Sequence, residues 1–295
     1  MKIVIRNPYS FKASQLIPNM GREFIRRLKL NRQRDRIRAI PFDPQKNRIK
    51  NILIETVSAC NNDCSFCPVN VIRREFGIMD FRLFEKIITD LEKANWRGKI
   101  GLFGNNEPLL DGEIFGKLKL VRKRLPDSFH YILTNGKLLT RDKLILLDSL
   151  GLNRIVVNNY DDSLKLLPNL KKLTAELKEE NFDLKTEVVV VLRKKNEVLT
   201  SRGGKAPNKL LATTPYLRHV CLYPFFQLNI NWRGDFPLCC NDVGWEVVVG
   251  NVSGKSIGDI WNGGRLNEAR SILLSAGRKG ISICSKCDFF VDKSL

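Results

Sequence analysis

The segment Asn51-Ile-Leu-Ile-Glu-Thr-Val-Ser-Ala-Cys-Asn-Asn-Asp-Cys-Ser-Phe-Cys67 runs from an apolar stretch into a loop that carries three cysteines. The apolar part, residues 51–57, predicts a buried strand. Cys60, Cys64 and Cys67 follow it with the spacing C-x3-C-x2-C. Thiolates gathered in this way select an iron–sulfur cluster or zinc. Three ligands leave one iron of a cubane cluster open to another ligand, whereas a structural zinc site normally takes a fourth protein ligand.

The cysteines of the chain fall into tight groups, at 60–67, 221, 239–240 and 284–287. Because the sequence shows no apolar core of a signal peptide, this grouping indicates metal ligation rather than disulfide bonds. No stretch reaches the roughly 18 consecutive apolar residues that a membrane span needs. We therefore expect a cytoplasmic protein without a membrane partner.

The formal net charge of +19 is strongly positive for a chain of 295 residues. A nucleic acid, a membrane surface or an anionic substrate would each explain this charge. Solubility alone would also explain it, because the basic residues are spread along the whole chain. The aromatic-spaced basic stripe of RNA-binding modules is not visible, so nucleic acid is not the favoured partner.

From residue 50 onward, apolar strand candidates alternate with helix-like segments. This alternation predicts βαβ units and a parallel sheet. Five to six such units are too few for a complete eight-fold barrel of about 250 residues. The expected fold class is therefore α/β, with an open, partial (β/α)6 TIM-like barrel. The strand candidates are 51–57, 99–103, 129–133, 153–157 and 186–192, and the helix candidates are 81–94, 112–124, 141–149 and 162–180.

The segments on either side of the alternating region differ from it. Residues 1–49 form a basic N-terminal extension, in which 21–30 carries apolar residues at helical spacing. Residues 201–220 are rich in glycine and proline and predict a long loop that closes the barrel region. A hairpin-like stretch over 225–239 and a helix around 256–275 follow. We expect domain boundaries at 1–49, 50–205 and 206–295.

The C-x3-C-x2-C spacing after a strand, with Phe66 directly before the third cysteine, resembles the radical S-adenosylmethionine (radical SAM) superfamily. The resemblance implies that Cys60, Cys64 and Cys67 hold a [4Fe–4S] cluster. The open iron would bind the amino and carboxylate groups of S-adenosyl-L-methionine, whose reductive cleavage gives a 5′-deoxyadenosyl radical. Phe66 would lie against this cofactor.

Polar residues at the ends of later strand candidates resemble further motifs of that family. After Gly104, the residues Asn105-Asn106-Glu107-Pro108 resemble the Gly-Gly-Glu-Pro motif of the family, which holds the methionyl amino group of the cofactor, with Asn105 and Asn106 in place of the two glycines. Apart from Gly, Asn is the residue type that best tolerates positive φ, so the replacement of glycine by Asn is a mild departure from the motif. It leaves open whether Asn106 or Glu107 contacts the amino group. Two further cofactor contacts are implied, at Asn135 in Thr-Asn-Gly and at Asn158 facing the ribose.

The C-terminal cysteines resemble the SPASM/twitch extension of radical SAM enzymes. Cys221, Gly234-x4-Cys239 and Cys284-x2-Cys287 supply four thiolates, which implies one auxiliary [4Fe–4S] cluster in a small C-terminal domain. A zinc ribbon would use the same four thiolates. Cys240 is left over, because adjacent strand residues point to opposite faces. It is either a packing residue or a thiol offered to the substrate.

Arg202 lies on the loop before Cys221, where similar aminocyclitol-oxidising enzymes have an arginine that contacts the substrate hydroxyl. A solvated loop arginine is the alternative. We therefore treat Arg202 and Cys240 as the candidate catalytic residues.

The resemblance implies hydrogen abstraction from a C–H bond, giving dehydrogenation or epimerisation. The absence of an obvious peptide-recognition domain favours a small polyol, a sugar or an aminocyclitol, and the positive charge leaves an anionic substrate open. An electron donor such as flavodoxin or ferredoxin would be the protein partner. Two alternatives stay open. The same radical could modify a ribosomally made peptide, or the chain could be a basic zinc or iron–sulfur protein that binds nucleic acid.

Overall fold

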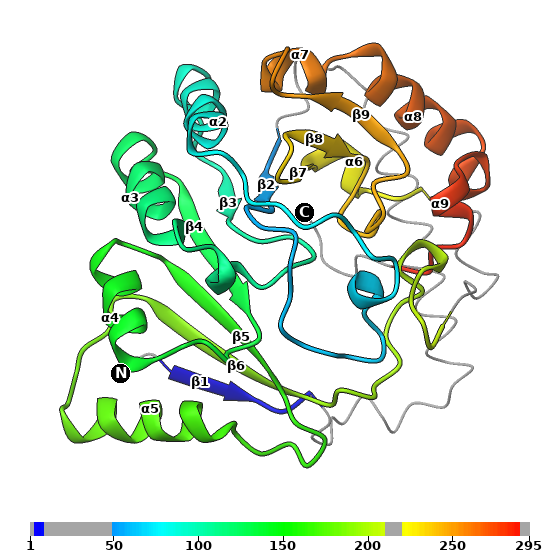
Figure 1. The fold of residues 1–295 in the computed structure, drawn as a ribbon. Helices are drawn as coiled ribbons and strands as arrows, with labels where there is room; N and C mark the ends of the chain where they lie inside the picture. Colours follow the sequence, from blue (N-terminus) through cyan, green and yellow to red (C-terminus); the bar gives the residue numbers. More distant parts are fainter. Residues whose placement is uncertain (1–2, 9–48, 210–219, 290–295) are drawn as a thin grey trace.

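The central feature of the fold is a seven-stranded sheet in which all neighbouring strands are parallel (Figure 1). The computed structural model describes residues 3–8, 49–209 and 220–289. The strands are β1 (Ile3–Arg6), β2 (Asn51–Ile54), β3 (Lys99–Gly101), β4 (Phe129–Thr134), β5 (Arg154–Tyr160), β6 (Glu187–Arg193) and β7 (Gln227–Ile230). Their order is β1-β6-β5-β4-β3-β2-β7. The expectation of an open, partial parallel barrel is confirmed.

Helices follow β2 to β5 one by one along the chain and cover the outer face of the sheet (Figure 1). They are α2 (Phe81–Lys93), α3 (Ile114–Arg124), α4 (Arg141–Ser149) and α5 (Pro168–Glu179). In α2, Asp80 caps the first turn by accepting from the backbone of Arg82 at 2.8 Å. The buried positions Phe84, Ile87, Ile88 and Leu91 recur at helical spacing.

The main core lies between this helical layer and the outward side chains of the strands. Ile52, Ile54, Ile100, Ile132 and Ile155 are fully buried there. Apolar side chains come from β2 to β5 in turn, so helices and strands enclose one continuous core. The other face of the sheet carries polar residues and forms the walls of the site.

Two strands of the sheet lie outside the expected barrel region of 50–205. β1 pairs with β6, so residues 3–6 belong to the sheet and not to a separate extension. β7 pairs with β2 and is buried at every position, so it completes the sheet and does not form the first arm of a hairpin. The hairpin in this part of the chain is β8 (Asp235–Pro237) with β9 (Val248–Asn251). The helical pattern at 21–30 lies outside the described residues.

The C-terminal part packs beside β7 with short helices (Figure 1). The expected single helix around 256–275 is two helices, α7 (Ile257–Trp261) and α8 (Gly264–Ser275). Gly263 has extended backbone angles between them and begins α8 as its N-cap, which ends the helical hydrogen-bond pattern of α7. Short helical turns α6 (Tyr223–Phe226), η6 (Gly277–Gly280) and α9 (Ser282–Ser285) complete this part.

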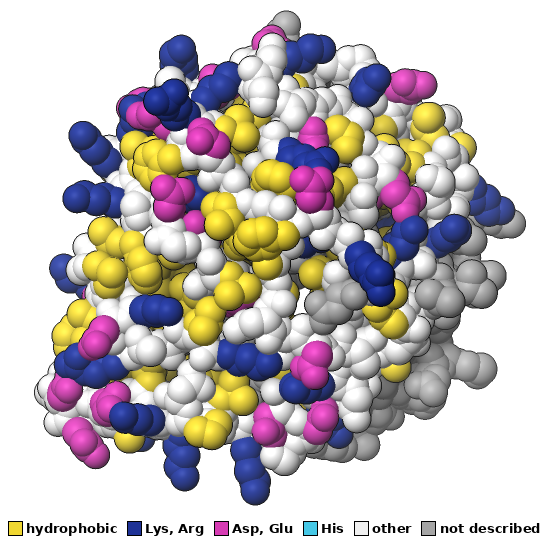
Figure 2. Space-filling view, viewed as in Figure 1, with side chains coloured by type: hydrophobic (Ala, Val, Ile, Leu, Met, Phe, Trp, Pro, Cys, Tyr) yellow, Lys and Arg dark blue, Asp and Glu magenta, His cyan; other side chains and the backbone are white. Residues whose placement is uncertain are grey.

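The surface charges on the face in Figure 2 are mixed. Lys and Arg side chains are spread around this face with Asp and Glu between them, and they do not gather in one patch. Among the helices that the structure describes, none combines the length and apolar character of a membrane span.

Candidate active site

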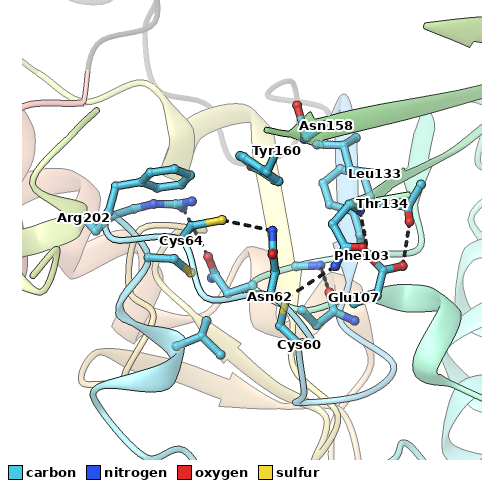
Figure 3. Close-up of a pocket in the computed structure, with 17 residues that line it drawn as sticks. Cys60, Asn62, Cys64, Phe103, Glu107, Leu133, Thr134, Asn158, Tyr160 and Arg202 are labelled. Carbon is cyan, nitrogen blue, oxygen red and sulfur yellow. Dashed lines mark hydrogen bonds between the residues drawn. The ribbon is translucent and has the colours of Figure 1, made fainter. Parts of the chain in front are cut away.

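One cavity opens at the carboxyl ends of the central parallel strands (Figure 3). The space between its walls is about 650 Å³, part of it open to solvent. Its wall includes every residue that the sequence assigned to the first cluster and to the cofactor, together with Arg202. These residues are Cys60, Cys64, Cys67, Phe66, Gly104, Asn105, Asn106, Glu107, Asn135 and Asn158. Loops after parallel strands meet at one edge, and the cavity lies there.

The three-cysteine loop is folded back on itself. The backbone N–H of Cys67 donates to Cys64 O at 3.0 Å, and Asn62 Nδ2 donates to Cys64 Sγ at 3.1 Å. Burial raises the pKa of Cys60, and burial with the neighbouring thiols raises the pKa of Cys64 to about 12. Ligation requires thiolates, so a positively charged group must compensate for their charge in this loop, as iron does in a cluster.

The Glu107 carboxylate is held by donors of its own chain. Oε1 accepts from Thr134 Oγ1 at 2.7 Å and from the Leu109 N–H at 3.0 Å, and Oε2 accepts from the Asn135 N–H at 2.7 Å. By contrast, Asn106 Nδ2 is buried and has no hydrogen-bond partner among the described residues. An acceptor on a bound molecule, such as a carboxylate oxygen, would satisfy this amide, so the site fits the expected cofactor.

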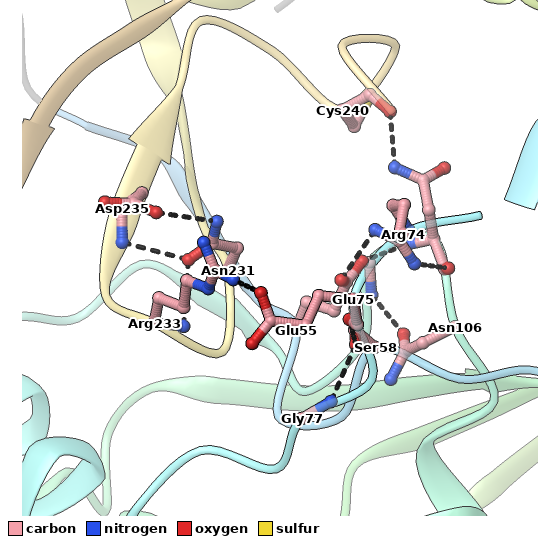
Figure 4. A network of polar contacts seen from close by, with 12 residues as sticks. Glu55, Ser58, Arg74, Glu75, Gly77, Asn106, Asn231, Arg233, Asp235 and Cys240 are labelled. Carbon is pink, nitrogen blue, oxygen red and sulfur yellow. Dashed lines mark hydrogen bonds and ion pairs between the residues drawn. The ribbon is translucent and has the colours of Figure 1, made fainter. Parts of the chain in front are cut away.

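Asn105 uses all four of its polar groups in hydrogen bonds, and its side-chain amide connects the cavity wall to the C-terminal part. Figure 4 shows three of its partners, Glu55, Arg74 and Cys240. Its N–H donates to Glu55 Oε2 at 2.6 Å, and its carbonyl accepts from Arg74 Nη2 at 2.5 Å. Its side-chain Nδ2 donates to Cys240 O at 2.9 Å, and Oδ1 accepts from Arg202 Nη1 at 3.2 Å. A glycine, the usual residue of the family here, would make only the two backbone contacts.

Tyr160 is a wall residue that the sequence interpretation missed. Its ring lies 5.7 Å from that of Phe66, and burial raises the pKa of its hydroxyl. Tyr160 stands two positions after Asn158, so both side chains face the same side of β5. The expected strand ended at residue 157, which left this alternation out of view.

A second cavity brings together the four C-terminal cysteines assigned to the auxiliary cluster. The space between its walls is about 290 Å³, part of it open to solvent, and it is lined by Cys221, Cys239, Cys284, Cys287, Gly203, Asn241, Arg278 and Ile283. Burial raises the pKa of the thiols of Cys239, Cys284 and Cys287. Within the described ranges, no three His, Cys, Asp or Glu side chains are grouped to hold a single metal ion.

Cys240 lines neither of these cavities. It borders a small third cavity with Glu55, Asn105 and Trp245. Cys239 and Cys240 lie beyond the end of β8, so the expected strand alternation does not apply to them. Both border the third cavity, but only Cys239 also lies in the wall of the four-cysteine cavity. Cys240 is not among the residues that line the first cavity.

The loop Ser201–Gly204 separates the two main cavities. Arg202 lines the first cavity and its neighbour Gly203 lines the second. Both have positive φ, +49° and +65°, and a Cβ on Gly203 would lie 3.3 Å from Asn241 O. Ser201 fixes the loop, because its N–H donates to Asp288 Oδ1 at 2.7 Å.

Comparison with known proteins agrees with this geometry. The model of the radical SAM superfamily matches residues 54–189, and the model of the SPASM iron–sulfur cluster-binding domain matches residues 221–288. The chain is 26% identical over 238 residues to the S-adenosyl-L-methionine-dependent 2-deoxy-scyllo-inosamine dehydrogenase of Niallia circulans, covering 80% of this chain and 92% of that protein. It is 34% identical over 108 residues to a tungsten-containing aldehyde ferredoxin oxidoreductase cofactor-modifying protein of Pyrococcus furiosus, covering 36% of this chain and 30% of that protein.

Solved structures show the same relationship. A crystal structure of BtrN in complex with AdoMet and 2-DOIA has a TM-score of 0.71 and 25% identity, covering 82% of this chain and 93% of that one. Native anSMEcpe with bound AdoMet has a TM-score of 0.53 and 16% identity, covering 77% and 88%, and shares the fold. The expected resemblance is confirmed: residues 54–189 form a domain of the radical SAM superfamily, and residues 221–288 form a SPASM iron–sulfur cluster-binding domain.

Proposed function

We propose that this enzyme is an oxidoreductase that dehydrogenates a small polyol, an aminocyclitol or a sugar. The observation that carries the proposal is the loop Ser201–Gly204, which places Arg202 at the first cavity and Gly203 at the four-cysteine cavity. The similarity to a 2-deoxy-scyllo-inosamine dehydrogenase over most of both chains supports the substrate class. A site for the substrate and a site for an electron thus lie on opposite sides of one loop.

The residues of the first cavity fit S-adenosyl-L-methionine and a [4Fe–4S] cluster held by Cys60, Cys64 and Cys67. Bound there, the cofactor and the reduced cluster would supply the radical chemistry that removes a hydrogen atom from carbon. The protein must hold that carbon in place and keep water away. Phe66, Tyr160 and Leu133 provide apolar wall for this purpose.

Oxidation of an alcohol to a carbonyl removes one hydrogen atom, one proton and one electron from the substrate. Arg202 is permanently cationic, so its role is to stabilise the substrate oxygen as negative charge develops on it. An auxiliary [4Fe–4S] cluster, held by the cysteines of the cavity that Gly203 lines, would supply an acceptor for the electron. The proton leaves to solvent through the open side of the cavity.

Epimerisation is the competing reaction of the same superfamily, and it requires a hydrogen donor on the face opposite the abstraction. A thiol is suited to that task, but Cys240 borders the third cavity and is not in the wall of the first. Dehydrogenation therefore agrees better with the arrangement of the side chains. A ribosomally made peptide is the second candidate substrate, and the experiment below tests it.

The remaining parts of the proposal concern the setting of the reaction. The first cluster needs one-electron reduction, for which a flavodoxin or ferredoxin is the expected donor. The positive net charge favours an anionic surface on that donor, and it leaves an anionic substrate open. We place the protein in the cytoplasm.

The test is anaerobic purification with iron and zinc analysis, followed by reduction with dithionite in the presence of S-adenosyl-L-methionine and 2-deoxy-scyllo-inosamine. We expect 5′-deoxyadenosine and a ketone in equal amounts. The variant with Cys60, Cys64 and Cys67 all replaced by Ala should form neither and should retain about half of the iron, at the second site. A colourless, zinc-loaded protein would contradict the proposal, and 5′-deoxyadenosine formed only with a peptide would move the substrate to the second class.

A further inference from the structure

Arg278 is a buried cation in the wall of the four-cysteine cavity. Its exposed fraction is 3%, and it lies in η6, between α8 and α9. Nη1 donates to Cys287 O at 2.9 Å, and Nη2 donates to Phe289 O at 2.7 Å. The guanidinium therefore holds the backbone that carries and follows the last cysteine of the set.

These contacts do not neutralise the charge of the side chain. Among the described residues, Arg278 makes no ion pair, and the nearby Asp288 carboxylate pairs with Lys209 instead. The Nε–H of Arg278 is buried without a hydrogen-bond partner in the described part of the chain. A buried guanidinium that contacts only carbonyl groups is costly unless an anion lies beside it. The structure thus leaves both a positive charge and one N–H donor unused at this wall.

The other wall residues identify the missing anion. Cys221, Cys239, Cys284 and Cys287 face the same cavity, and as cluster ligands each of them brings a negative charge. The sulfur atoms of such a site also accept hydrogen bonds, and these bonds are among the factors that set the potential of an iron–sulfur cluster.

We propose that Arg278 sets the reduction potential of the auxiliary cluster by donating its Nε–H to a sulfur atom and by placing a buried positive charge beside it. The proposal rests on the assignment of that cluster to the four-cysteine cavity. The reduced cluster carries one more negative charge than the oxidised cluster. A nearby cation therefore stabilises the reduced form more and raises the potential. A higher potential makes the cluster a better acceptor for the electron that dehydrogenation releases.

Neighbouring residues offer a matched set of variants. Arg278→Gln removes the charge from the cavity wall. Lys279→Gln removes the same charge from the next residue, which is exposed and does not line the cavity. Arg278→Lys keeps the charge but loses the planar group that holds two carbonyls and presents Nε–H at once.

The experiment is a redox titration in which electron paramagnetic resonance measures the fraction of reduced cluster at each potential. It uses the full-length protein with Cys60, Cys64 and Cys67 replaced by Ala, so that one cluster gives the signal. We expect Arg278→Gln to shift the midpoint potential to a more negative value, Arg278→Lys to shift it less, and Lys279→Gln to leave it close to the parent value. The readout requires no substrate, so it stays separate from any failure of the proposed dehydrogenation.

Two results would overturn the proposal: an unchanged potential in Arg278→Gln, or an equal shift in Lys279→Gln. If Arg278→Gln loses its cluster, the midpoint potential of Arg278→Lys becomes the test. An unchanged potential in that variant also overturns the proposal. A parent protein without iron would show that the four-cysteine cavity holds no cluster, and the proposal would fall with that assignment.

Discussion

Arg202 and Asn105 are joined by a hydrogen bond of 3.2 Å from Arg202 Nη1 to Asn105 Oδ1. The bond connects the loop between the two cavities with the motif that follows β3. Asn105 is itself fixed on three further sides, by Glu55, Arg74 and the Cys240 carbonyl. Arg202 thus has a rigid acceptor, which restricts where its guanidinium can lie in the first cavity.

We predict that Asn105→Ala lowers kcat/KM for 2-deoxy-scyllo-inosamine about tenfold, because Arg202 loses its acceptor and moves. The reference is a double-mutant cycle with Arg202→Ala, in which the effects of the two changes should not add. Asn105→Asp keeps an acceptor for Arg202 but loses the donor to the Cys240 carbonyl, so it should recover only part of the activity. Full additivity of the two alanine changes would show that Asn105 does not act through Arg202.

A second prediction concerns Glu107, whose two oxygens accept three hydrogen bonds. Glu107→Gln places an NH2 group where the Thr134, Asn135 and Leu109 donors leave room only for acceptors. We expect the free energy of unfolding to fall by about 1–3 kcal/mol, measured by urea denaturation. Glu179→Gln, at the exposed end of α5, is the control and should change it by less than about 0.5 kcal/mol.

The two adjacent cysteines give a third prediction. Cys239→Ala should remove the iron of the auxiliary site and destabilise the C-terminal part, because that cluster would also crosslink the chain. Cys240→Ala should retain the full iron content, since Cys240 lies outside the four-cysteine cavity. Iron analysis and thermal unfolding measure both effects. The opposite pattern would mean that the cluster ligand is Cys240.

The individual helices and strands could be predicted from the sequence because the spacing of apolar residues differs between a helix and a strand. The helix expected over 141–149 has the bounds of α4, and α2 ends one residue before the expected end. The places of β1 and β7 could not be predicted in this way. A short apolar run gives no sign of its partner, and both strands pair with segments more than a hundred residues away.

The site residues that lie at the ends of strands could be predicted from the sequence. Asn135 and Asn158 meet the cysteine loop because parallel strands share one carboxyl edge. Tyr160 was missed because the expected strand ended too early. Arg278 gave no signal, because one arginine in a strongly basic chain looks like surface charge until its burial is known.

The last prediction uses His130, a buried residue of β4 that lies far from both sets of cysteines in the sequence. Its exposed fraction is 1%, and its Nε2 lies 3.1 Å from Leu125 O. Burial, assisted by the Arg122 charge, lowers the pKa of His130 to about 4. The unfolded chain has an ordinary histidine pKa near 6.5. Between these values the unfolded state binds a proton that the folded state does not. The stability contributed by neutral His130 is therefore present above pH 6.5 and is lost as the pH falls toward 4.

We expect this single group to lower the free energy of unfolding by about 2 kcal/mol between pH 7 and pH 5. The measurement is urea unfolding at both pH values for the wild type and for His130→Gln, which can still donate to Leu125 O. Any acid loss of the clusters affects both proteins equally, so the difference between them isolates the histidine. The wild type should lose about 2 kcal/mol more than the variant over this interval. An equal loss in both proteins would show that His130 does not titrate between these pH values.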